Sequence, residues 1–398
     1  MAEVKASVLH GAKDLRVESR SLASPSADEV QVAVQATGLC GSDLHYHGHY
    51  RNGDILVREP MTLGHESAGT VTAVGSGASG LQVGDRVALE VGLPCESCAL
   101  CQSGRYNICR GMNFRSSAKA FPHSQGTLQE RINHPAKWCH KLPPAVSLEQ
   151  GALVEPLSVA FHAHSRAGLT RETAADATIL ILGAGAVGLC CAYASRVLWN
   201  PKRIVIADIQ TDRVDFAVQN GFADVAVTVP LGRPQSIEDK LEYARGVADL
   251  VKTAKVPGSD GEVVGEVAAT FECTGVETCM QAAIYSTQPG GKVMMIGMGT
   301  PIQTLPLSAA ALREVDLVGV FRYANTYPKI IELLANPPAS SSAEVEGGSS
   351  KSRIPDITKL ITQRYKGLEN IPKAFDMASK VKDEQGNLVI KVFVDMSE

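Results

Sequence analysis

The chain carries two short runs of reactive side chains near its N-terminal end: Cys40-Gly41-Ser42-Asp43-Leu44-His45 and Gly64-His65-Glu66-Ser67-Ala68-Gly69. They supply a thiolate, an imidazole and a carboxylate, which are the groups that bind zinc in proteins. A catalytic zinc keeps one position open beside three protein ligands, so Cys40 and His65 require a third. Glu66 and the more distant Glu155 are the candidates. A lone cysteine is more often a small buried apolar residue, but the combination indicates a metal site.

A second set of thiols follows at Cys95, Cys98, Cys101 and Cys109. Four thiolates at these short spacings can surround one zinc ion as a tetrahedron. Because sulfur then fills every position, the site is predicted to be structural. Four unrelated thiols are the alternative, and their close spacing disfavours it.

A dinucleotide-binding pattern begins with the apolar run 178–182, which predicts a buried strand. It is followed at once by Gly183-Ala184-Gly185-Ala186-Val187-Gly188 and by a helical run over 189–198. Glycines at these positions let the backbone approach a pyrophosphate, which the helix N-terminus attracts. The next predicted strand, 203–208, ends in Asp208, whose carboxylate suits the ribose hydroxyls and favours NAD over NADP. Arg213 is the nearby cation, either contacting the cofactor or lying on a helix surface.

Bulk properties limit the class of protein. The 398 residues suggest two domains, and 44% hydrophobic residues allow sizeable cores. A net charge of −4 argues against a nucleic-acid-binding protein. The start of the sequence has no secretory pattern, and no apolar run is long enough to cross a membrane. The chain has ten cysteines, which in a reducing compartment are more often ligands or buried thiols than disulfides. These features together predict a soluble cytoplasmic protein.

The hydrophobic pattern predicts two different architectures in the two halves of the chain. Alternating apolar and polar residues over 1–37 and 66–92 predict antiparallel strands, and 148–162 predicts a helix that links the domains. Strands are expected at 224–229, 269–275, 291–297 and 316–321, in an alternating strand–helix order that predicts a parallel, doubly wound sheet. A last strand is expected at 388–394. The charged stretch Ile237–Val264 receives no function, and Pro337–Arg353 is expected to be an exposed, mobile loop.

These motifs carry a family resemblance. Gly64-His65-Glu66 with Gly69, Gly75 and Gly84-Asp85-Arg86-Val87 resembles the zinc signature of the medium-chain alcohol dehydrogenases, and the run from Cys40 to Asp43 resembles their first-ligand motif. The resemblance covers nearly the whole chain and is specific to the polyol branch at 153–157 and 321–323. It implies an α/β protein with a GroES-like β-barrel catalytic domain, formed by 1–159 plus 323–398, and a Rossmann NAD-binding domain at 160–322.

The resemblance also implies an activity, the oxidation of a polyol secondary alcohol to a ketose with hydride transfer to NAD. Sorbitol and xylitol are the expected substrate types, with L-arabinitol and L-iditol as alternatives. A zinc-free quinone reductase and a non-catalytic nucleotide-binding protein are disfavoured because no ligand or glycine is missing. One catalytic zinc, one structural zinc and a homotetramer are expected.

Individual residues receive roles from the same resemblance. Ser42 and His45 are expected to relay the proton, with Glu66 exchanging with Glu155 as a zinc ligand or holding a water. The expected substrate-binding residues are Ser42, Tyr46, Phe114, Glu155, Arg322 and Tyr323. The expected cofactor-binding residues are Gly183, Gly185, Val187, Gly188, Asp208, Arg213 and Arg322.

Overall fold

The computed structural model describes residues 2–338 and 354–397, which form two compact units. In its described parts, the first unit comprises Met1–Ser158, Ala324–Asn336 and Thr358–Glu398, and the second comprises Val159–Tyr323 and Pro337–Ile357. The domain limits expected from the sequence, 1–159 plus 323–398 and 160–322, stay a prediction; Tyr323 and the described part of Pro337–Ile357 fall in the second unit. The loop expected at Pro337–Arg353 falls, from residue 339 onward, outside the described residues.

The first unit is built on a seven-stranded sheet around β3 (Glu29–Gly38), whose path runs β12-β8-β7-β3-β20-β19, with β11 also pairing β3. The other strands are β7 (Glu66–Val74), β8 (Arg86–Leu89), β11 (Arg131–Pro135), β12 (Cys139–Lys141), β19 (Ile361–Lys366) and β20 (Lys391–Asp395). A smaller sheet joins β1 (Ala2–Gly11), β2 (Asp14–Leu22) and β6 (Met61–Thr62). Antiparallel pairing of the N-terminal strands, expected from their alternating pattern, is confirmed. The last strand starts at Lys391 rather than at 388, because the Val389 N–H donates to the Val381 carbonyl instead of to the sheet.

The second unit contains a six-stranded sheet in the order β15-β14-β13-β16-β17-β18, and every pair in it is parallel. Its strands are β13 (Thr178–Leu182), β14 (Arg203–Asp208), β15 (Val225–Thr228), β16 (Val267–Glu272), β17 (Thr287–Met295) and β18 (Asp316–Gly319). β13 is buried along its whole length, as parallel strands covered on both faces are. The predicted doubly wound sheet is confirmed, although β17 begins earlier than 291.

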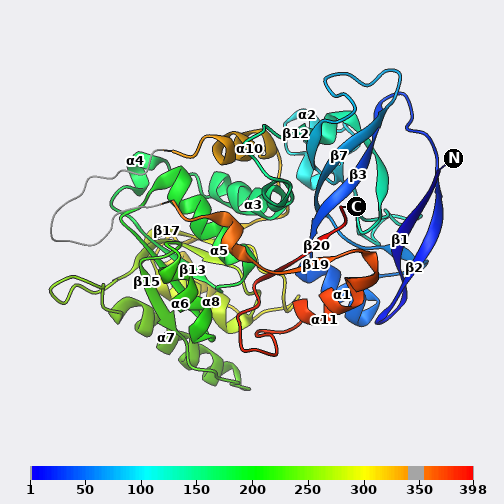
Figure 1. The fold of residues 1–398 in the computed structure, drawn as a ribbon. Helices are drawn as coiled ribbons and strands as arrows, with labels where there is room; N and C mark the ends of the chain where they lie inside the picture. The colour runs from blue at the N-terminus through cyan, green and yellow to red at the C-terminus, as the bar shows by residue number, and fades with distance from the viewer. Residues whose placement is uncertain (1, 339–353, 398) are drawn as a thin grey trace. The chain divides into compact units, whose positions relative to one another are not determined.

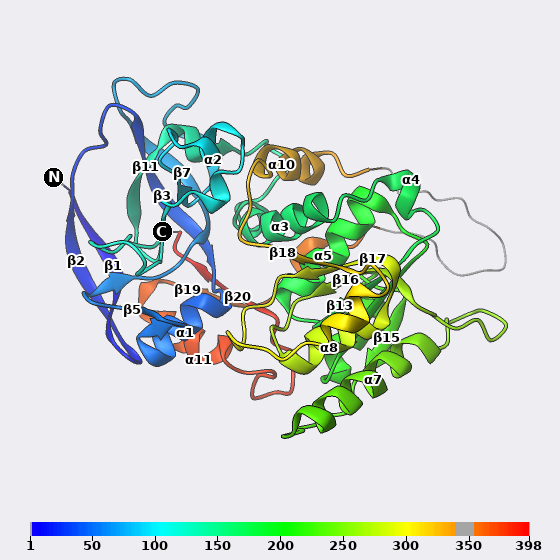
Figure 2. The ribbon, with the colours of Figure 1, turned by 180° about the vertical axis from the view of Figure 1, so that it is seen from behind.

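Helices α5 (Ala186–Ala194), α6 (Thr211–Gln219), α7 (Ile237–Thr253) and α8 (Glu277–Ser286) lie alongside the strands of this sheet (Figure 1). The charged stretch that begins at Ile237 is not a loose insertion, because α7 buries Ala244, Val247 and Val251 in the core of the second unit. Its charged residues occupy the opposite face, as in any amphipathic helix. Figure 2 shows α7 and α8 from behind, beside β13, β15 and β16.

Helices also shape the first unit, namely α1 (Gly41–His49), α2 (Ala99–Gln102), α10 (Tyr327–Ala335) and α11 (Ile371–Ala378). The predicted linking helix is confirmed as α3 (Leu148–Ala167), which continues from the first unit into the second. Among the described residues, no helix is long and apolar enough to cross a membrane.

Candidate active site

The sheet register brings the two reactive runs together. Gly38, the last residue of β3, pairs with Glu66, the first residue of β7, so Cys40 and His65 lie just beyond the same sheet end. A side chain at Gly38 would place its Cβ 2.3 Å from a Glu66 carboxylate oxygen. Gly64 has φ +93°, and a Cβ there would lie 2.9 Å from the Leu128 side chain. Glycine is therefore required at both positions for the carboxylate and the imidazole to occupy this site.

Cys40, His65 and Glu66 offer one ligand atom each, and these three atoms lie within 4.8 Å of one another. His65 and Glu66 are buried, and Cys40 is half-buried at the N-terminus of α1. Sulfur, imidazole nitrogen and carboxylate oxygen form the mixed donor set that a catalytic zinc uses. The residues present therefore fit a zinc ion. Glu155, buried within α3, is outside this group of three in the described chain.

A buried aspartate orients His65. The Asp43 Oδ1 atom lies 3.2 Å from His65 Nδ1 and accepts hydrogen bonds from the Ser116 hydroxyl at 2.7 Å and the Gly64 N–H at 3.1 Å. Burial favours the neutral carboxyl, but His65 and these donors outweigh it and lower the pKa of Asp43. Burial likewise opposes the charged imidazole, but Asp43 and Cys40 raise the pKa of His65 well above its ordinary value. Carboxylates of this kind fix the orientation of a metal-binding histidine.

Two functional side chains of this site were not predicted from the sequence. One is Asp43, although it lies inside the quoted Cys40–His45 run. The other is Lys391, whose ammonium group donates to both Glu66 oxygens, at 2.7 and 2.8 Å, and to the Leu39 carbonyl at 3.0 Å. A buried cation next to three expected metal ligands could not be found by motif, because it lies 325 residues from Glu66. Its only sequence signal is a charge inside an apolar terminal strand.

The predicted relay and pocket residues are distributed around this cluster. The Ser42 hydroxyl lies 3.5 Å from His65 Nε2, and His45 is exposed on the same helix. Phe114, in β10 (Asn113–Phe114), packs edge-on against His65 with ring centroids 5.6 Å apart. Tyr46 is buried in the core of the first unit, and its hydroxyl accepts the Ala118 N–H.

Arg322 and Tyr323 lie at the end of the second unit. Tyr323 is buried, whereas Arg322 is half-buried with its guanidinium over the Phe321 ring, 5.0 Å from the ring centroid.

The four predicted structural thiols converge in the first unit. Cys95, Cys98, Cys101 and Cys109 form a second group with all ligand atoms within 4.8 Å. Neighbouring sulfurs are separated by 3.4 Å for Cys95–Cys109 and 3.5 Å for Cys98–Cys101. Hydrogen bonds from backbone N–H groups lower the pKa of the Cys95 thiol to about 6, which favours the thiolate that metals bind. The set fits a tetrahedral zinc with no open position.

The second unit carries the glycine-rich turn at the end of β13. A Cβ on Gly188 would lie 1.8 Å from the Gly183 carbonyl oxygen, and Gly183 has φ +97°. Gly185 is the residue preceding α5, whose first helical residues include Val187. This open turn fits a dinucleotide pyrophosphate.

Asp208, at the end of β14, is held by the Ala184 and Gln210 N–H groups at 2.7 and 2.8 Å. Both carboxylate oxygens are therefore oriented before any ribose binds. Arg213 lies on α6, and its guanidinium would be 3.9 Å from a Cβ on Gly185.

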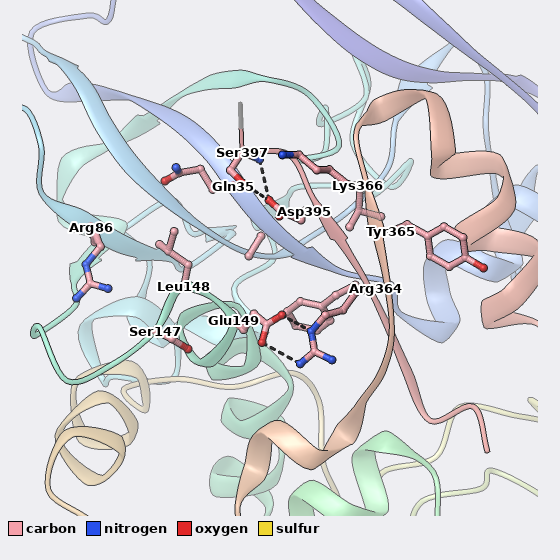
Figure 3. A pocket seen from close by; sticks show the side chains of 13 residues that line it. Gln35, Arg86, Ser147, Leu148, Glu149, Arg364, Tyr365, Lys366, Asp395 and Ser397 are labelled. Carbon is pink, nitrogen blue, oxygen red and sulfur yellow. Dashed lines mark hydrogen bonds and ion pairs between the residues drawn. The ribbon is translucent and has the colours of Figure 1, made fainter. Parts of the chain in front are cut away.

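A separate pocket of about 470 Å³ lies in the first unit, between β3, β19, β20 and the start of α3 (Figure 3). Arg364 donates two hydrogen bonds to Glu149 in it, at 2.6 and 3.0 Å. None of the residues predicted to bind metal, cofactor or substrate lines this pocket. This pocket is therefore separate from the candidate metal site formed by Cys40, His65 and Glu66.

Comparison with known proteins assigns the family. Residues 26–144 match the alcohol dehydrogenase GroES-like domain, and residues 186–336 match the zinc-binding dehydrogenase domain. The chain belongs to the zinc-dependent medium-chain alcohol dehydrogenase family. The expected family, the GroES-like and Rossmann-type domains and the zinc-binding character of the chain are confirmed.

Relatives of the polyol branch match this dehydrogenase over nearly its full length. It is 39% identical to sorbitol dehydrogenase of Bos taurus, covering 94% of this chain and 92% of that protein. It is 38% identical to sorbitol dehydrogenase of Arabidopsis thaliana (99% and 96%) and 36% identical to L-idonate 5-dehydrogenase of Vitis vinifera (99% and 95%). Among solved structures, an Escherichia coli oxidoreductase of unknown specificity superposes with a TM-score of 0.80 at 28% identity, covering all of both chains.

Proposed function

We propose that this dehydrogenase oxidises a polyol secondary alcohol to a ketose, sorbitol to fructose or xylitol to xylulose, with NAD as hydride acceptor. The observation that carries the proposal is the convergence of Cys40, His65 and Glu66 in a chain that is 39% identical to a sorbitol dehydrogenase over 94% of its length. When bound, zinc supplies a Lewis acid for the substrate oxygen, and the nicotinamide accepts the hydride.

The chain's own residues then move the proton. Ser42, beside His65, accepts the proton of the substrate hydroxyl and passes it to His45. Because His45 is exposed on α1, it delivers the proton to solvent. We propose Phe114 as a pocket residue, Tyr46 and Arg322 as donors to the distal hydroxyls, and Tyr323 as a further substrate-binding residue.

For the metal, we propose Cys40 and His65 as permanent ligands, with Glu155 and Glu66 alternating as the third. The pairing of Glu66 with Lys391 supports Glu155 as the ligand in the resting state. A crystal structure of the zinc-loaded enzyme with both carboxylates far from the metal would overturn this assignment. For the cofactor, Asp208 supports NAD, because a carboxylate repels a 2′-phosphate.

The decisive experiment measures zinc per subunit by elemental analysis on a sample assayed with NAD and NADP against sorbitol, xylitol, L-arabinitol, L-idonate and ethanol. We expect two zinc ions, strong polyol turnover with NAD and little turnover of ethanol. L-Idonate is included because one relative carries that name. Its preferential oxidation would replace the polyol proposal with a sugar-acid one. Ser42→Ala should lower kcat by about 10²- to 10⁴-fold if the relay operates.

We also propose a homotetramer in the cytoplasm. Exposed apolar side chains on the second unit support self-association, with Met298 67%, Ile302 84% and Leu312 87% exposed. The ten free cysteines support a reducing compartment. Light scattering coupled to gel filtration tests the first proposal, and cell fractionation tests the second.

A further inference from the structure

The ten histidines of the chain differ sharply in their exposure to solvent. All ten lie within the described residues, and only His45 and His49 are exposed. Both belong to α1, where residues four positions apart lie above one another on the same face of the helix. Their imidazole rings lie side by side, with centroids 6.3 Å apart and planes inclined by 29°. The two exposed imidazoles of the molecule are therefore neighbours.

The remainder of α1 fixes this pair of histidines in place. Tyr46 and His47, which lie between them in sequence, are buried, with 2% and 9% of their surfaces exposed. Tyr46 belongs to the core of the first unit, and the His47 ring packs against Phe375 with centroids 4.6 Å apart. The two exposed imidazoles thus project from a helix that is packed against the core, so their backbone positions are set before any ligand binds.

Two imidazoles on one helix face form a chelating pair for a divalent transition-metal ion. Neutral imidazole nitrogen is a ligand that suits zinc, nickel and copper, and two histidines at this spacing on a helix can bind one ion together. In the described parts of the chain, neither His45 nor His49 forms a hydrogen bond or an ion pair, so both rings can turn towards an ion. His49 also lies in the last turn of α1, where the helix dipole favours a positive charge.

We propose that His45 and His49 form a surface site for a divalent transition-metal ion, and that an ion bound there inhibits the enzyme. The site shares no ligand with either of the two metal-binding clusters described above. The inhibition rests on the proposed function, which gives His45 a step in the proton relay, whereas the binding does not. When one ring nitrogen holds a metal and the other carries a hydrogen, the imidazole has no lone pair left to accept a proton. A metal-bound His45 therefore cannot take the proton from Ser42, and kcat falls.

The binding test uses the zinc-loaded, full-length enzyme and Ni²⁺. Nickel is a better probe than copper because Cu²⁺ oxidises thiols, and the chain has ten free cysteines. Isothermal titration calorimetry should show one Ni²⁺ bound per subunit. His49→Gln keeps a polar side chain and leaves a single imidazole, so its affinity for Ni²⁺ should be about 10²-fold lower, because the second ligand is no longer supplied by the same helix. His10→Gln, the same substitution at a half-buried histidine that pairs with Glu18, is the matched control and should bind Ni²⁺ as the wild type does.

The inhibition test measures kcat for sorbitol with and without saturating Ni²⁺, and the ratio of the two values cancels any difference in basal rate between variants. In the wild type and His10→Gln, Ni²⁺ should lower kcat by at least about ten-fold, a part of the 10²- to 10⁴-fold that a positioned proton-transfer group contributes. His49→Gln should keep its full kcat at the same Ni²⁺ concentration. Zinc per subunit, measured on the same samples, should not change.

Each part of the proposal has its own contradicting result. Equal affinity for Ni²⁺ in the wild type and His49→Gln would overturn the site. A bound ion that leaves kcat unchanged would overturn the inhibition, and so would equal inhibition of His49→Gln, which would point to displacement of zinc. If the wild type oxidises no polyol, the proposed function fails, whereas the calorimetry still decides whether the histidine pair binds the ion.

Discussion

The Lys391 ammonium group and the Glu66 carboxylate form a buried ion pair, with Nζ 2.7 and 2.8 Å from the two oxygens and both side chains nearly inaccessible to solvent. Glu66 is also one of the three clustered side chains that could hold a metal ion. The pair therefore neutralises a carboxylate at the edge of the metal site and competes with the metal for it.

Lys391→Met should destabilise the fold, because it leaves Glu66 buried without its cation. Removing one partner of a buried pair costs about 3–5 kcal/mol. Chemical denaturation of the metal-depleted protein measures this directly. Lys391→Arg keeps the charge and should retain most of the stability, and adding Glu66→Gln to Lys391→Met should recover part of the loss. Equal stability of the wild type and Lys391→Met would show that the pair contributes nothing to folding.

Asp43→Asn should weaken zinc binding at Cys40 and His65. The carboxylate that orients the imidazole is lost, and such changes typically cost about 10- to 100-fold in metal affinity or activity. Competition with a chromophoric chelator measures the affinity. Ser116→Ala removes only one hydrogen bond to Asp43 and should have a smaller effect. The interpretation is wrong if both variants bind zinc as the wild type does.

Asp208→Ala should raise the KM for NAD. The carboxylate proposed to accept from the ribose disappears, and one or two charge-assisted hydrogen bonds, at about 1.5–3 kcal/mol each, correspond to at least about ten-fold. The ratio of kcat/KM for NADP to that for NAD should rise, because the repulsion of a 2′-phosphate is removed. Asp215→Ala, an exposed acid on α6, is the control. A wild-type ratio in Asp208→Ala would exclude the proposed ribose contact.

The stability of the protein should decrease in acid partly through His164. Burial lowers the pKa of His164 to about 3, although the hydrogen bond that its Nδ1–H donates to the Ala160 carbonyl acts in the opposite direction. The unfolded chain takes up this proton near the ordinary histidine pKa of about 6.5, so the unfolded state binds more protons between about pH 6.5 and 3. The free energy of unfolding therefore falls as the pH falls through this window, by up to about 1.4 kcal/mol per pH unit from this residue.

His164→Gln removes that proton linkage. Denaturant unfolding between pH 7 and 4 measures how steeply the free energy of unfolding falls with pH. This slope should be smaller in the variant than in the wild type, by an amount that corresponds to the uptake of up to about one proton on unfolding. Its stability at pH 7 should also be lower, because His164 fills a site against Trp199 and Phe271 with ring centroids 4.3 and 4.4 Å away. If the free energy of unfolding falls with pH equally in both proteins, His164 takes up its proton as readily in the folded as in the unfolded state, and its pKa is not lowered by folding.

Much of this molecule could be read directly from the sequence. The apolar run 178–182 and the glycines after it predicted β13 and the turn before α5, because their backbone requirements are local. The spacing of the four cysteines predicted their convergence for the same reason, since a short loop can close around one ion. The candidate ligands Cys40 and His65 were recognisable because each lies in a glycine-containing motif.

The tertiary structure decided what depends on distant contacts. The pairing of Gly38 with Glu66 sets the ligand spacing, and Lys391 reaches Glu66 only because β20 lies beside β3. Asn325 reaches Tyr106 across 219 residues. A sequence specifies backbone conformation through neighbouring residues, whereas the partner of a buried charge or a loop hydroxyl is fixed by sheet register and packing, and no local pattern records it.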